Sequence, residues 1–420
     1  MKILVALMVP LMTVHSTYPN FVDHAKIPFP NGALSKQSVS GFIPISNASN
    51  TFYWLFLSDT GATKKPTIVW VQGQIGVSSM FGVVNEFTPN WLRDFNILFV
   101  DAPVGTGFSS TSSLTEMAST SEEIASQMYQ FLLGFFVRHA KDVGTDIIIA
   151  GEDYAGHTIP VLSALILHEP VASFNLKGIA GGNTHVHAPI QVITKAESAG
   201  MFGLVDGSCI EEARRHAWAA SAYSVAGETM ESLNERNLLE QTIQTCSPGI
   251  DMSNIGHMVS KPSELLEKLE NWMNTPSVRA ALNVSLPLET KVWAKNETVF
   301  NRLKPDIMRV MWDYIPPILD SGVRMLLYQG QLDWVDGVYS NEAWINALNW
   351  SGAEGYARSP RQPWSAGYLR TYGPLTEAML LNTGHLAIRE NPDDVLNLFK
   401  EIFLSEKPGP PELGTSVVVV

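Results

Sequence analysis

One short segment constrains the fold of this chain more than any other, the stretch from Asp146 to His168. Its first residues, Asp146-Ile147-Ile148-Ile149-Ala150, are apolar and β-branched, which predicts a buried strand. The run from Ile159 to His168 has the pattern of a helix. Between them, Asp153 stands in a turn with Gly151 two residues before it and a small residue two residues after it. A strand, a tight turn and a helix in this order present a nucleophile at the edge of a sheet, usually a serine.

The rest of the chain predicts an α/β-hydrolase fold, with a mostly parallel central sheet flanked by helices. Apolar runs alternate with helical patterns, as in α/β proteins. The expected parallel strands are 67–71, 95–100, 146–150, 176–180 and 324–328, and 40–45 with 52–57 forms a hairpin at the sheet edge. Strand patterns are missing from 189 to 274, which predicts an inserted helical cap between core segments 17–188 and 275–406.

Composition and the chain ends indicate a secreted protein. The formal charge of −13 argues against nucleic acid as a partner, because phosphates would be repelled. Lys2 and the apolar run 3–14 predict a signal peptide at 1–16, and that run is too short to anchor the chain in a membrane. The proline-rich tail 407–420 is expected to be disordered. We therefore expect the secretory pathway, with an extracellular or lysosomal destination.

Cysteines and sequons fit this destination. Cys209 and Cys246 are the two cysteines of the chain, and in an oxidising compartment we expect them to form a disulfide. Four Asn-x-Ser/Thr sequons predict glycosylation at Asn47, Asn283, Asn296 and Asn349. The oligomeric state stays open, and a dimer is one option.

No cofactor or metal is predicted. His185 and His187 alternate in an expected loop, a pattern more typical of solvated histidines than of a metal site, and the sequence offers no third ligand. The expected partner is a peptide or small molecule bound in a cleft.

Six ordered motifs resemble those of the serine carboxypeptidase family. They are W-V-Q-G at 70–73 with Glu86, D-A-P-V-G-T-G-F-S at 101–109, G-E-D-Y-A-G at 151–156, G-N-T at 182–184, Y-Q-G-Q-L-D at 328–333 and G-H at 384–385. Together they cover most of the chain and are far more specific than any one of them. Glutamine at positions 72 and 331 of these motifs resembles the vitellogenic carboxypeptidase-like branch of the family.

The resemblance implies a role for each matching residue. His385 would be the general base, Asp333 would orient it, and Asp153 occupies the position of the nucleophilic serine. Backbone N–H groups of Gly73 or Gln74 and of Tyr154 would form the oxyanion hole. Trp70, Gln72, Glu86 and Glu152 would hold the C-terminal carboxylate of a peptide, through carboxyl–carboxylate hydrogen bonds favoured at acid pH.

Four departures from the family pattern cut against activity. They are Asp153 for the serine, Gln74-Ile75 for Gly-Pro, Thr184 for the second glycine of G-N-G, and 386–388 for the residues after the base. A carboxylate has no hydroxyl proton to give up, and its attack on an amide would form a less stable anhydride. If position 74 requires a positive φ, Gln74 also re-aims an oxyanion donor. His385 between two carboxylates should be held as imidazolium, unable to act as a base.

The sequence therefore leaves three functional hypotheses. The first is a carboxypeptidase homologue that binds a ligand without cleaving peptides. The second is an Asp-nucleophile hydrolase of the epoxide or alkyl-halide type, using Asp153, His385 and Asp333, with Tyr223 of the cap as a candidate donor. The third is residual carboxypeptidase activity with Ser78 or Ser79 supplying the nucleophile. We favour the first.

Overall fold

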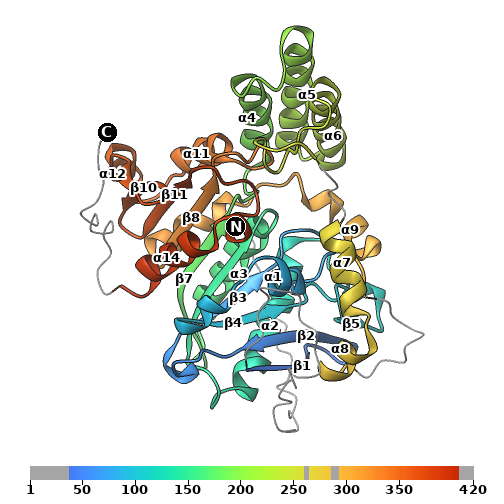
Figure 1. Ribbon diagram of the computed structural model, residues 1–420, viewed down its shortest axis with the longest axis vertical. Helices are drawn as coiled ribbons and strands as arrows, with labels where there is room; N and C mark the ends of the chain where they lie inside the picture. Colours follow the sequence, from blue (N-terminus) through green and yellow to red (C-terminus); the bar gives the residue numbers. More distant parts are fainter. Residues whose placement is uncertain (1–36, 260–263, 285–292, 406–420) are drawn as a thin grey trace.

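The computed structural model describes residues 37–259, 264–284 and 293–405, which form a large sheet with helices on both faces (Figure 1). The predicted signal peptide at 1–16 and the predicted disordered tail at 407–420 lie outside these ranges. Within the described ranges, no helix is both long enough and apolar enough to cross a membrane.

The sheet is parallel in its centre and antiparallel at its two edges. Its strands run in the order β1-β2-β4-β3-β6-β7-β8-β11-β10-β9, with β5 beside β2. Neighbours from β4 to β11 pair in parallel, and the remaining pairs are antiparallel. The strands are β1 (Ser38–Pro44), β2 (Ser49–Phe56), β3 (Thr67–Val71), β4 (Asn96–Val100), β5 (Ser110–Thr111), β6 (Asp146–Glu152), β7 (Asn175–Gly182), β8 (Arg324–Gly330), β9 (Gln362–Trp364), β10 (Gly367–Tyr372) and β11 (Leu375–Leu380). This arrangement confirms the predicted fold class.

Helices cover both faces of the sheet and fill the long insertion between β7 and β8. They are α1 (Met80–Asn85), α2 (Ser121–Arg138), α3 (Ala155–His168), α4 (Ala188–Met201), α5 (Gly207–Ala226), α6 (Thr229–Cys246), α7 (Glu264–Met273), α8 (Pro276–Ala281), α9 (Glu297–Leu303), α10 (Ile315–Asp320), α11 (Val338–Ala347), α12 (Ala353–Arg358), α13 (Ala387–Glu390) and α14 (Pro392–Phe403).

The core is split by the sheet into two apolar layers, because successive side chains of a strand point to opposite faces. On β3, Val69 and Val71 pack in the layer that contains α2 and α3. Ile68 and Trp70 pack in the opposite layer, with α1 and α14. Central strands buried on both faces read as continuous apolar runs, which is why the sequence located them.

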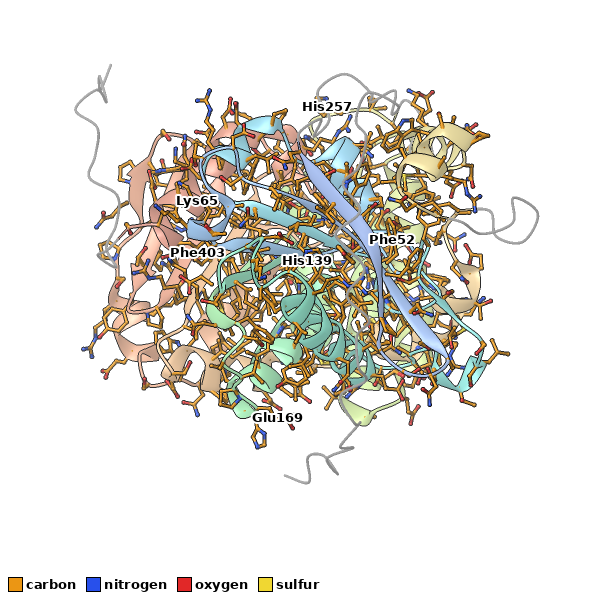
Figure 2. The ribbon with its side chains drawn as sticks, turned by 90° about the horizontal axis from the view of Figure 1, so that it is seen from below. Phe52, Lys65, His139, Glu169, His257 and Phe403 are labelled. Carbon is orange, nitrogen blue, oxygen red and sulfur yellow. A yellow bond between two sulfur atoms is a disulfide. The ribbon has the colours of Figure 1, made fainter. Side chains whose placement is uncertain are left out.

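The hairpin of β1 and β2 closes one edge of the sheet and is tied to the end of α2. The Tyr53 hydroxyl lies 2.7 Å from His139 Nε2, next to the C-terminus of α2. Figure 2 views this edge of the molecule and labels Phe52 and His139. Phe52 packs edge-on against Phe108, so the hairpin is joined to the core by both polar and aromatic contacts.

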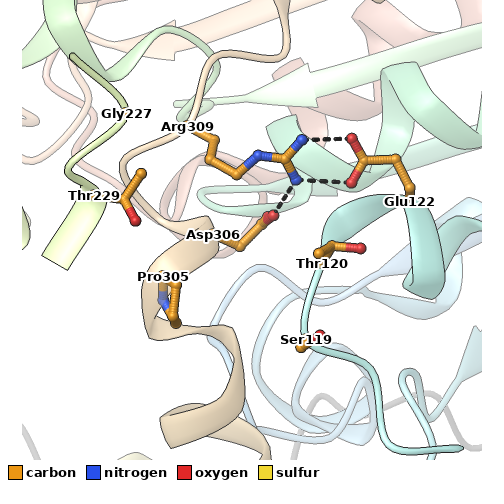
Figure 3. Close-up of a pocket in the computed structure, with 8 residues that line it drawn as sticks. All are labelled: Ser119, Thr120, Glu122, Gly227, Thr229, Pro305, Asp306 and Arg309. Atoms are coloured by element: carbon orange, nitrogen blue, oxygen red, sulfur yellow. Dashed lines mark hydrogen bonds and ion pairs between the residues drawn. The ribbon is translucent and has the colours of Figure 1, made fainter. Parts of the chain in front are cut away.

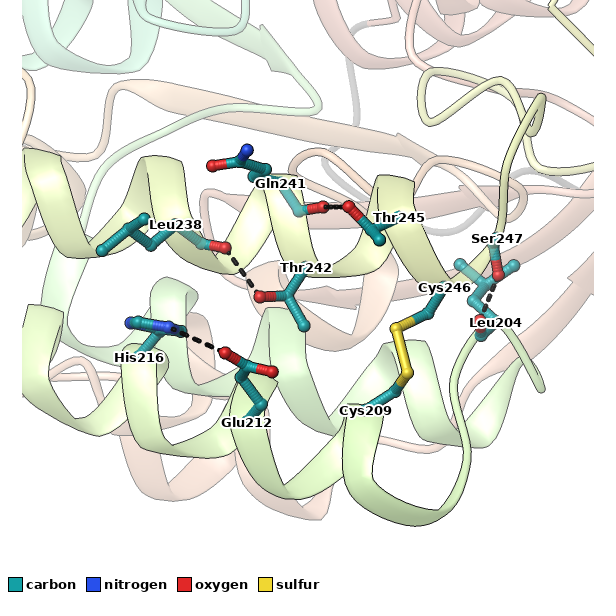
Figure 4. Close-up of a disulfide and its surroundings, with 10 residues drawn as sticks. All are labelled: Leu204, Cys209, Glu212, His216, Leu238, Gln241, Thr242, Thr245, Cys246 and Ser247. Carbon is teal, nitrogen blue, oxygen red and sulfur yellow. Dashed lines mark hydrogen bonds and ion pairs between the residues drawn. A yellow bond between two sulfur atoms is a disulfide. The ribbon is translucent and has the colours of Figure 1, made fainter.

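Helices α4, α5 and α6 stand together away from the sheet, drawn in green at the top of Figure 1. A disulfide between Cys209 and Cys246, with an S–S distance of 2.05 Å, joins the start of α5 to the end of α6 (Figure 4). Helix α7, which falls within the expected cap segment, buries Leu269 and Met273 in the layer that contains α1 and α14.

Candidate functional site

The turn between β6 and α3 holds Asp153 in the conformation of a nucleophile elbow. Its φ is 57°, in the left-handed region that aspartate tolerates better than most residues. The Asp153 N–H donates to the carbonyl of Gly182 at 3.1 Å. The Asp153 carbonyl accepts from the N–H groups of Gly156, at 3.0 Å, and His185, at 2.9 Å. The side chain is 28% exposed, so the fold accepts aspartate here and leaves its carboxylate accessible.

The structure brings His385 and Asp333 to this elbow. His385 Nδ1 lies 3.0 Å from Asp333 Oδ2, and His385 Nε2 lies 3.9 Å from Asp153 Oδ2. The Asp333 carboxylate is fixed by the backbone N–H groups of Val335 and Asp336, at 2.7 and 3.1 Å. The three side chains have the order of a catalytic triad, but a carboxylate stands at the end where a hydroxyl would attack.

The charge on His385 follows from these two neighbours. Burial lowers the pKa of His385, but the charge and hydrogen bond of Asp333, together with the carboxylate of Asp153 at 3.9 Å, outweigh it and raise the pKa well above its usual value. The ring is therefore an imidazolium at neutral pH, as the sequence predicted. An imidazolium has no lone pair with which to take a proton from a nucleophile or from water.

Asn183 is a positioning residue that the sequence did not identify. Its φ is 41°, and its side chain joins the loops that carry the site. The amide Nδ2 donates to the carbonyls of Gly384 and His385, at 3.1 and 2.7 Å. The amide oxygen accepts from the Gly330 N–H at 2.9 Å. The middle letter of the G-N-T motif was the available signal, and its role becomes visible only when the ends of β7 and β8 are placed side by side.

The loop at Gly73 and Gln74 carries N–H groups that were predicted to be oxyanion donors. A Cβ at position 73 would lie 1.8 Å from the carbonyl oxygen of Glu152, so only glycine fits. Gln74 is exposed and does not have a positive φ, so its backbone needs no glycine. The condition under which Gln74 was expected to re-aim its N–H group is therefore not met. Within the part of the chain that the structure describes, the N–H groups of Gln74 and Tyr154 have no hydrogen-bond acceptor. Both remain free to bind an anionic or carbonyl oxygen.

The four residues predicted to hold a carboxylate leave several polar atoms without hydrogen bonds. Gln72 Oε1, both oxygens of Glu86 and Oε2 of Glu152 have no partner among the described residues. The indole N–H of Trp70 lies beside Glu86 without meeting the geometry of a hydrogen bond. Oε1 of Glu152 accepts long hydrogen bonds from the Tyr328 hydroxyl, at 3.3 Å, and from a backbone N–H. Buried polar atoms without partners are rare in folded proteins, so this group is unusual.

The two glutamates in this set are uncharged over the acid range. Burial raises the pKa of Glu152 to about 7, against the opposing charge of His385. Burial, reinforced by the charge of Glu152, raises the pKa of Glu86 well above its usual value. In their protonated forms both side chains can donate a hydrogen bond to a ligand carboxylate.

Tyr154 connects the elbow to a polar pocket near the cap. Its hydroxyl donates to Asp306 Oδ2 at 2.6 Å, and His157 Nδ1 lies 3.3 Å from the same oxygen. Arg309 contacts both Asp306 and Glu122 at the edge of this pocket, which has a volume of about 400 Å³ (Figure 3). The lining residues are Ser119, Thr120, Glu122, Gly227, Thr229, Pro305, Asp306 and Arg309. None of the predicted site residues lines this pocket. Its one arginine, Arg309, is already paired with Glu122 and Asp306.

His185 and His187 are buried, which corrects the prediction that they are solvated. Their side chains meet polar partners inside the protein: His185 Nδ1 lies 3.2 Å from Asp336 Oδ1, and His187 Nδ1 accepts from the Ile190 N–H at 3.2 Å. Burial lowers the pKa of His187 to about 4, so its ring is neutral. Alternation in a loop did not reveal the burial of His185 because its polar partners come from distant segments. No metal-binding group of side chains is found among the described residues.

The four sequons differ in accessibility. Asn47, Asn283 and Asn349 are exposed. Asn296 is half-buried and caps the N-terminus of α9: its Oδ1 accepts from the N–H groups of Thr298 and Val299, and its Nδ2 donates to the Gly105 carbonyl at 2.8 Å. A glycan on Nδ2 would compete with this packing.

The sheet order, the elbow and the sequence order of elbow, acid and histidine define the α/β-hydrolase class. Among solved structures, the chain is similar to KEX1(delta)p, a prohormone-processing carboxypeptidase from Saccharomyces cerevisiae, with a TM-score of 0.76 and 22% identity over 91% of this chain and 94% of that one. A proline iminopeptidase of Mycobacterium smegmatis matches with a TM-score of 0.50 and 11% identity over 87% of this chain and 97% of that one. These likenesses establish the fold.

The chain belongs to the serine carboxypeptidase family, because the model of that family matches residues 28–405. Similar proteins include serine carboxypeptidase-like 47 of Arabidopsis thaliana, 27% identical over 89% of this chain and 79% of that protein. Another is the probable serine carboxypeptidase CPVL of Dictyostelium discoideum, 27% identical over 88% of this chain and 79% of that protein. The predicted family is thereby confirmed.

Proposed function

We propose that this chain is a member of the serine carboxypeptidase family that no longer cleaves peptides and that binds a ligand carrying a free carboxylate. The single observation that carries the proposal is the elbow itself. Asp153 has the backbone conformation of a nucleophile, but its side chain is a carboxylate that faces the imidazolium of His385 at 3.9 Å.

Loss of peptide cleavage follows from this arrangement. Acyl transfer begins when a neutral imidazole removes the proton of an attacking hydroxyl. Here the attacking group has no proton, and the imidazole is already protonated. An anhydride formed by attack of Asp153 would lie above the amide in free energy, so no favourable step is available.

Retention of binding is supported by the unpaired polar atoms of the predicted carboxylate-binding set. Glu86 and Glu152 are each only 3% exposed and have unpaired oxygens, and Trp70 is fully buried beside them. Unpaired buried groups cost stability, typically about 1–3 kcal/mol each, unless a ligand or water satisfies them. A ligand carboxylate that accepts hydrogen bonds from two protonated glutamates would satisfy them.

Two other candidates have less support. Water activation by an Asp-nucleophile hydrolase needs a neutral histidine, whereas His385 is an imidazolium. Tyr223 of the cap is 37% exposed, and its side chain makes no hydrogen bond to the elbow among the residues that the structure describes. Residual carboxypeptidase activity through Ser78 or Ser79 meets a different obstacle. Both are buried, and their hydroxyls donate to Asp101 and to the Val100 carbonyl, so neither is free to attack.

The secretory pathway, with an extracellular or lysosomal destination, completes the proposal. Three exposed sequons and the disulfide of the cap support it. The check is expression in a secreting cell with and without removal of residues 1–16, followed by glycosidase treatment of the product.

The deciding experiment measures turnover of the unmodified chain on N-blocked dipeptides between acid and neutral pH. We expect no release of the C-terminal amino acid and no labelling by a fluorophosphonate probe. Rates ordinary for an active family member would overturn the proposal. Trapping of an ester on Asp153 from an epoxide or alkyl halide would favour the Asp-nucleophile alternative instead.

A further inference from the structure

The elbow and the carboxylate-binding set form adjoining walls of one site. Glu152 and Asp153 are consecutive residues, and the loop that carries Gln72 and Gln74 packs directly on both. At Gly73 a Cβ would lie 1.8 Å from the Glu152 carbonyl oxygen and 2.8 Å from the Asp153 Cβ. The charge of His385, which contacts Asp153, also acts on the side chains of Glu86 and Glu152. The glutamates and the Asp153 carboxylate therefore share one neighbour, the His385 ring, and one supporting loop.

The charges at the two walls differ. The charges of Asp333 and His385, which lie 3.0 Å apart, cancel each other. The carboxylate of Asp153 therefore adds one further negative charge. The cations of the nearby cap already have acidic partners. Arg236 Nε lies 3.0 Å from Glu240, and its charge also interacts with those of Asp153 and Asp336. Lys195 Nζ lies 3.5 Å from Glu240 and 4.0 Å from Asp336. The elbow therefore has an excess of negative charge, while the neighbouring glutamates accept a carboxylate only in their neutral forms.

A ligand with a carboxylate alone fits one wall and is repelled by the other. Two unit charges about 4 Å apart repel by roughly 4 kcal/mol at an effective dielectric constant near 20. A ligand that places an ammonium group next to its carboxylate removes this conflict, because the ammonium can pair with Asp153. In an α-amino acid the two groups share one carbon atom, which matches two walls that meet at consecutive residues.

We propose that the ligand is a free α-amino acid, with its carboxylate on Trp70, Gln72, Glu86 and Glu152 and its ammonium group on Asp153. This inference rests on the proposed function and specifies its ligand class. In this arrangement Asp153 does not attack a peptide bond. It binds the free ammonium group of an amino acid. A peptide or N-blocked amino acid offers Asp153 an amide and an added carbonyl oxygen, and the carbonyl oxygen faces the carboxylate unfavourably.

The test begins with the full chain, secreted and purified. Thermal shift with each of the twenty free amino acids at mildly acid pH identifies the most stabilising one. Calorimetry then compares that amino acid with its N-acetyl derivative, which keeps only the carboxylate, and with its amide, which keeps only the ammonium. We expect the free amino acid to bind roughly tenfold to a hundredfold more tightly than either derivative, as for loss of one charge-assisted hydrogen-bond partner.

Asp153→Asn supplies the matched control, because it keeps the shape of the side chain and removes its charge. In this variant we expect the preference for the free amine over the N-acetyl form to fall by at least about tenfold, with binding of the N-acetyl form unchanged or improved. Its melting temperature establishes that it is folded, and Asp153→Ser offers a second neutral side chain at the same position.

Specific outcomes overturn the inference. Absence of stabilisation by every amino acid would do so, as would N-acetyl derivatives that bind the wild-type chain as tightly as the free forms. An unchanged preference in Asp153→Asn would have the same meaning. These results leave the lack of peptide cleavage untouched, whereas turnover of N-blocked dipeptides by the wild-type chain would remove the proposed function itself.

Discussion

The elbow and the carboxylate-binding set lie next to each other and differ in almost every physical respect. At the elbow two carboxylates, Asp333 at 3.0 Å and Asp153 at 3.9 Å, share the single cation of His385. In the adjoining set, Glu86 and Glu152 are buried, protonated in the acid range and largely without hydrogen-bond partners. Under the proposed function, the comparison teaches that reaction and recognition are separable in this fold, since one wall would lose the means of acyl transfer while the other keeps the means of holding a ligand.

The largest effect is expected from Asp153→Ser, which restores a hydroxyl at the elbow. Removal of the serine from a catalytic triad costs about 10⁶-fold in rate, and the other parts of this site are in place. We expect hydrolysis of N-blocked dipeptides at acid pH to rise at least about a thousandfold over the wild-type chain. Asp153→Ala is the control that removes the carboxylate without supplying a nucleophile. An inert serine variant would show that residue 153 is not the sole reason for the lack of peptide hydrolysis.

The next largest effect is expected from loss of the Asn183 side chain, which supports the loop of His385. Asn183→Ala removes three hydrogen bonds that join Gly330, Gly384 and His385. We expect the free energy of unfolding, measured by urea denaturation, to fall by about 2–4 kcal/mol.

Asn183→Gly is the matched variant, because glycine relieves the left-handed backbone at φ 41° and lacks the same amide. Similar losses in both variants would assign the effect to the hydrogen bonds. Full stability of the glycine variant would assign it to backbone strain in the alanine variant.

A smaller effect tests the carboxylate-binding set alone. Glu152 donates a hydrogen bond only when protonated, and its pKa is about 7. As the pH rises above 7, the side chain ionises, and affinity for a ligand carboxylate should fall by up to about tenfold per pH unit for one proton. Calorimetry from acid to alkaline pH measures this slope.

Glu152→Gln keeps a neutral donor at every pH and should flatten the profile. A wild-type affinity that rises above pH 7 would mean that the glutamate is not the donor.

The smallest effect is expected at the oxyanion loop. Gln74 does not have a positive φ, so Gln74→Gly in the Asp153→Ser background should change the rate of dipeptide hydrolysis by less than about threefold. Loss of one oxyanion donor costs roughly 10²–10³-fold, so a large gain on glycine substitution would show that the N–H is misplaced in the wild-type loop.

Much of the fold could be predicted from the sequence because buried parallel strands form continuous apolar runs. The predicted strand 67–71 coincides with β3, and the predicted strand 146–150 lies within β6. The strands β5, β9, β10 and β11 were not predicted. The first three are short or partly exposed, so their sequences carry little apolar signal. Strand β11 is buried, but threonine and glutamate interrupt its apolar run.

The site was predictable only where a motif marked it. The triad and the carboxylate-binding set were located by ordered motifs, whereas the contact of Tyr154 with Asp306 joins residues 152 positions apart and has no local signature. The burial of His185 was missed for the same reason, since its partner Asp336 follows 151 positions later. Such pairs depend on how β7, β8 and their loops meet in space.

The side chain of Asn296 is both the acceptor of a predicted sequon and the N-terminal cap of α9. In the folded chain its amide nitrogen holds the Gly105 carbonyl and its amide oxygen caps α9. If the chain enters the secretory pathway as proposed, sugar transfer to this asparagine and formation of α9 would compete for the same side chain. The fraction of molecules with a glycan at Asn296, measured by mass spectrometry, would report how fast this corner of the protein closes inside the cell.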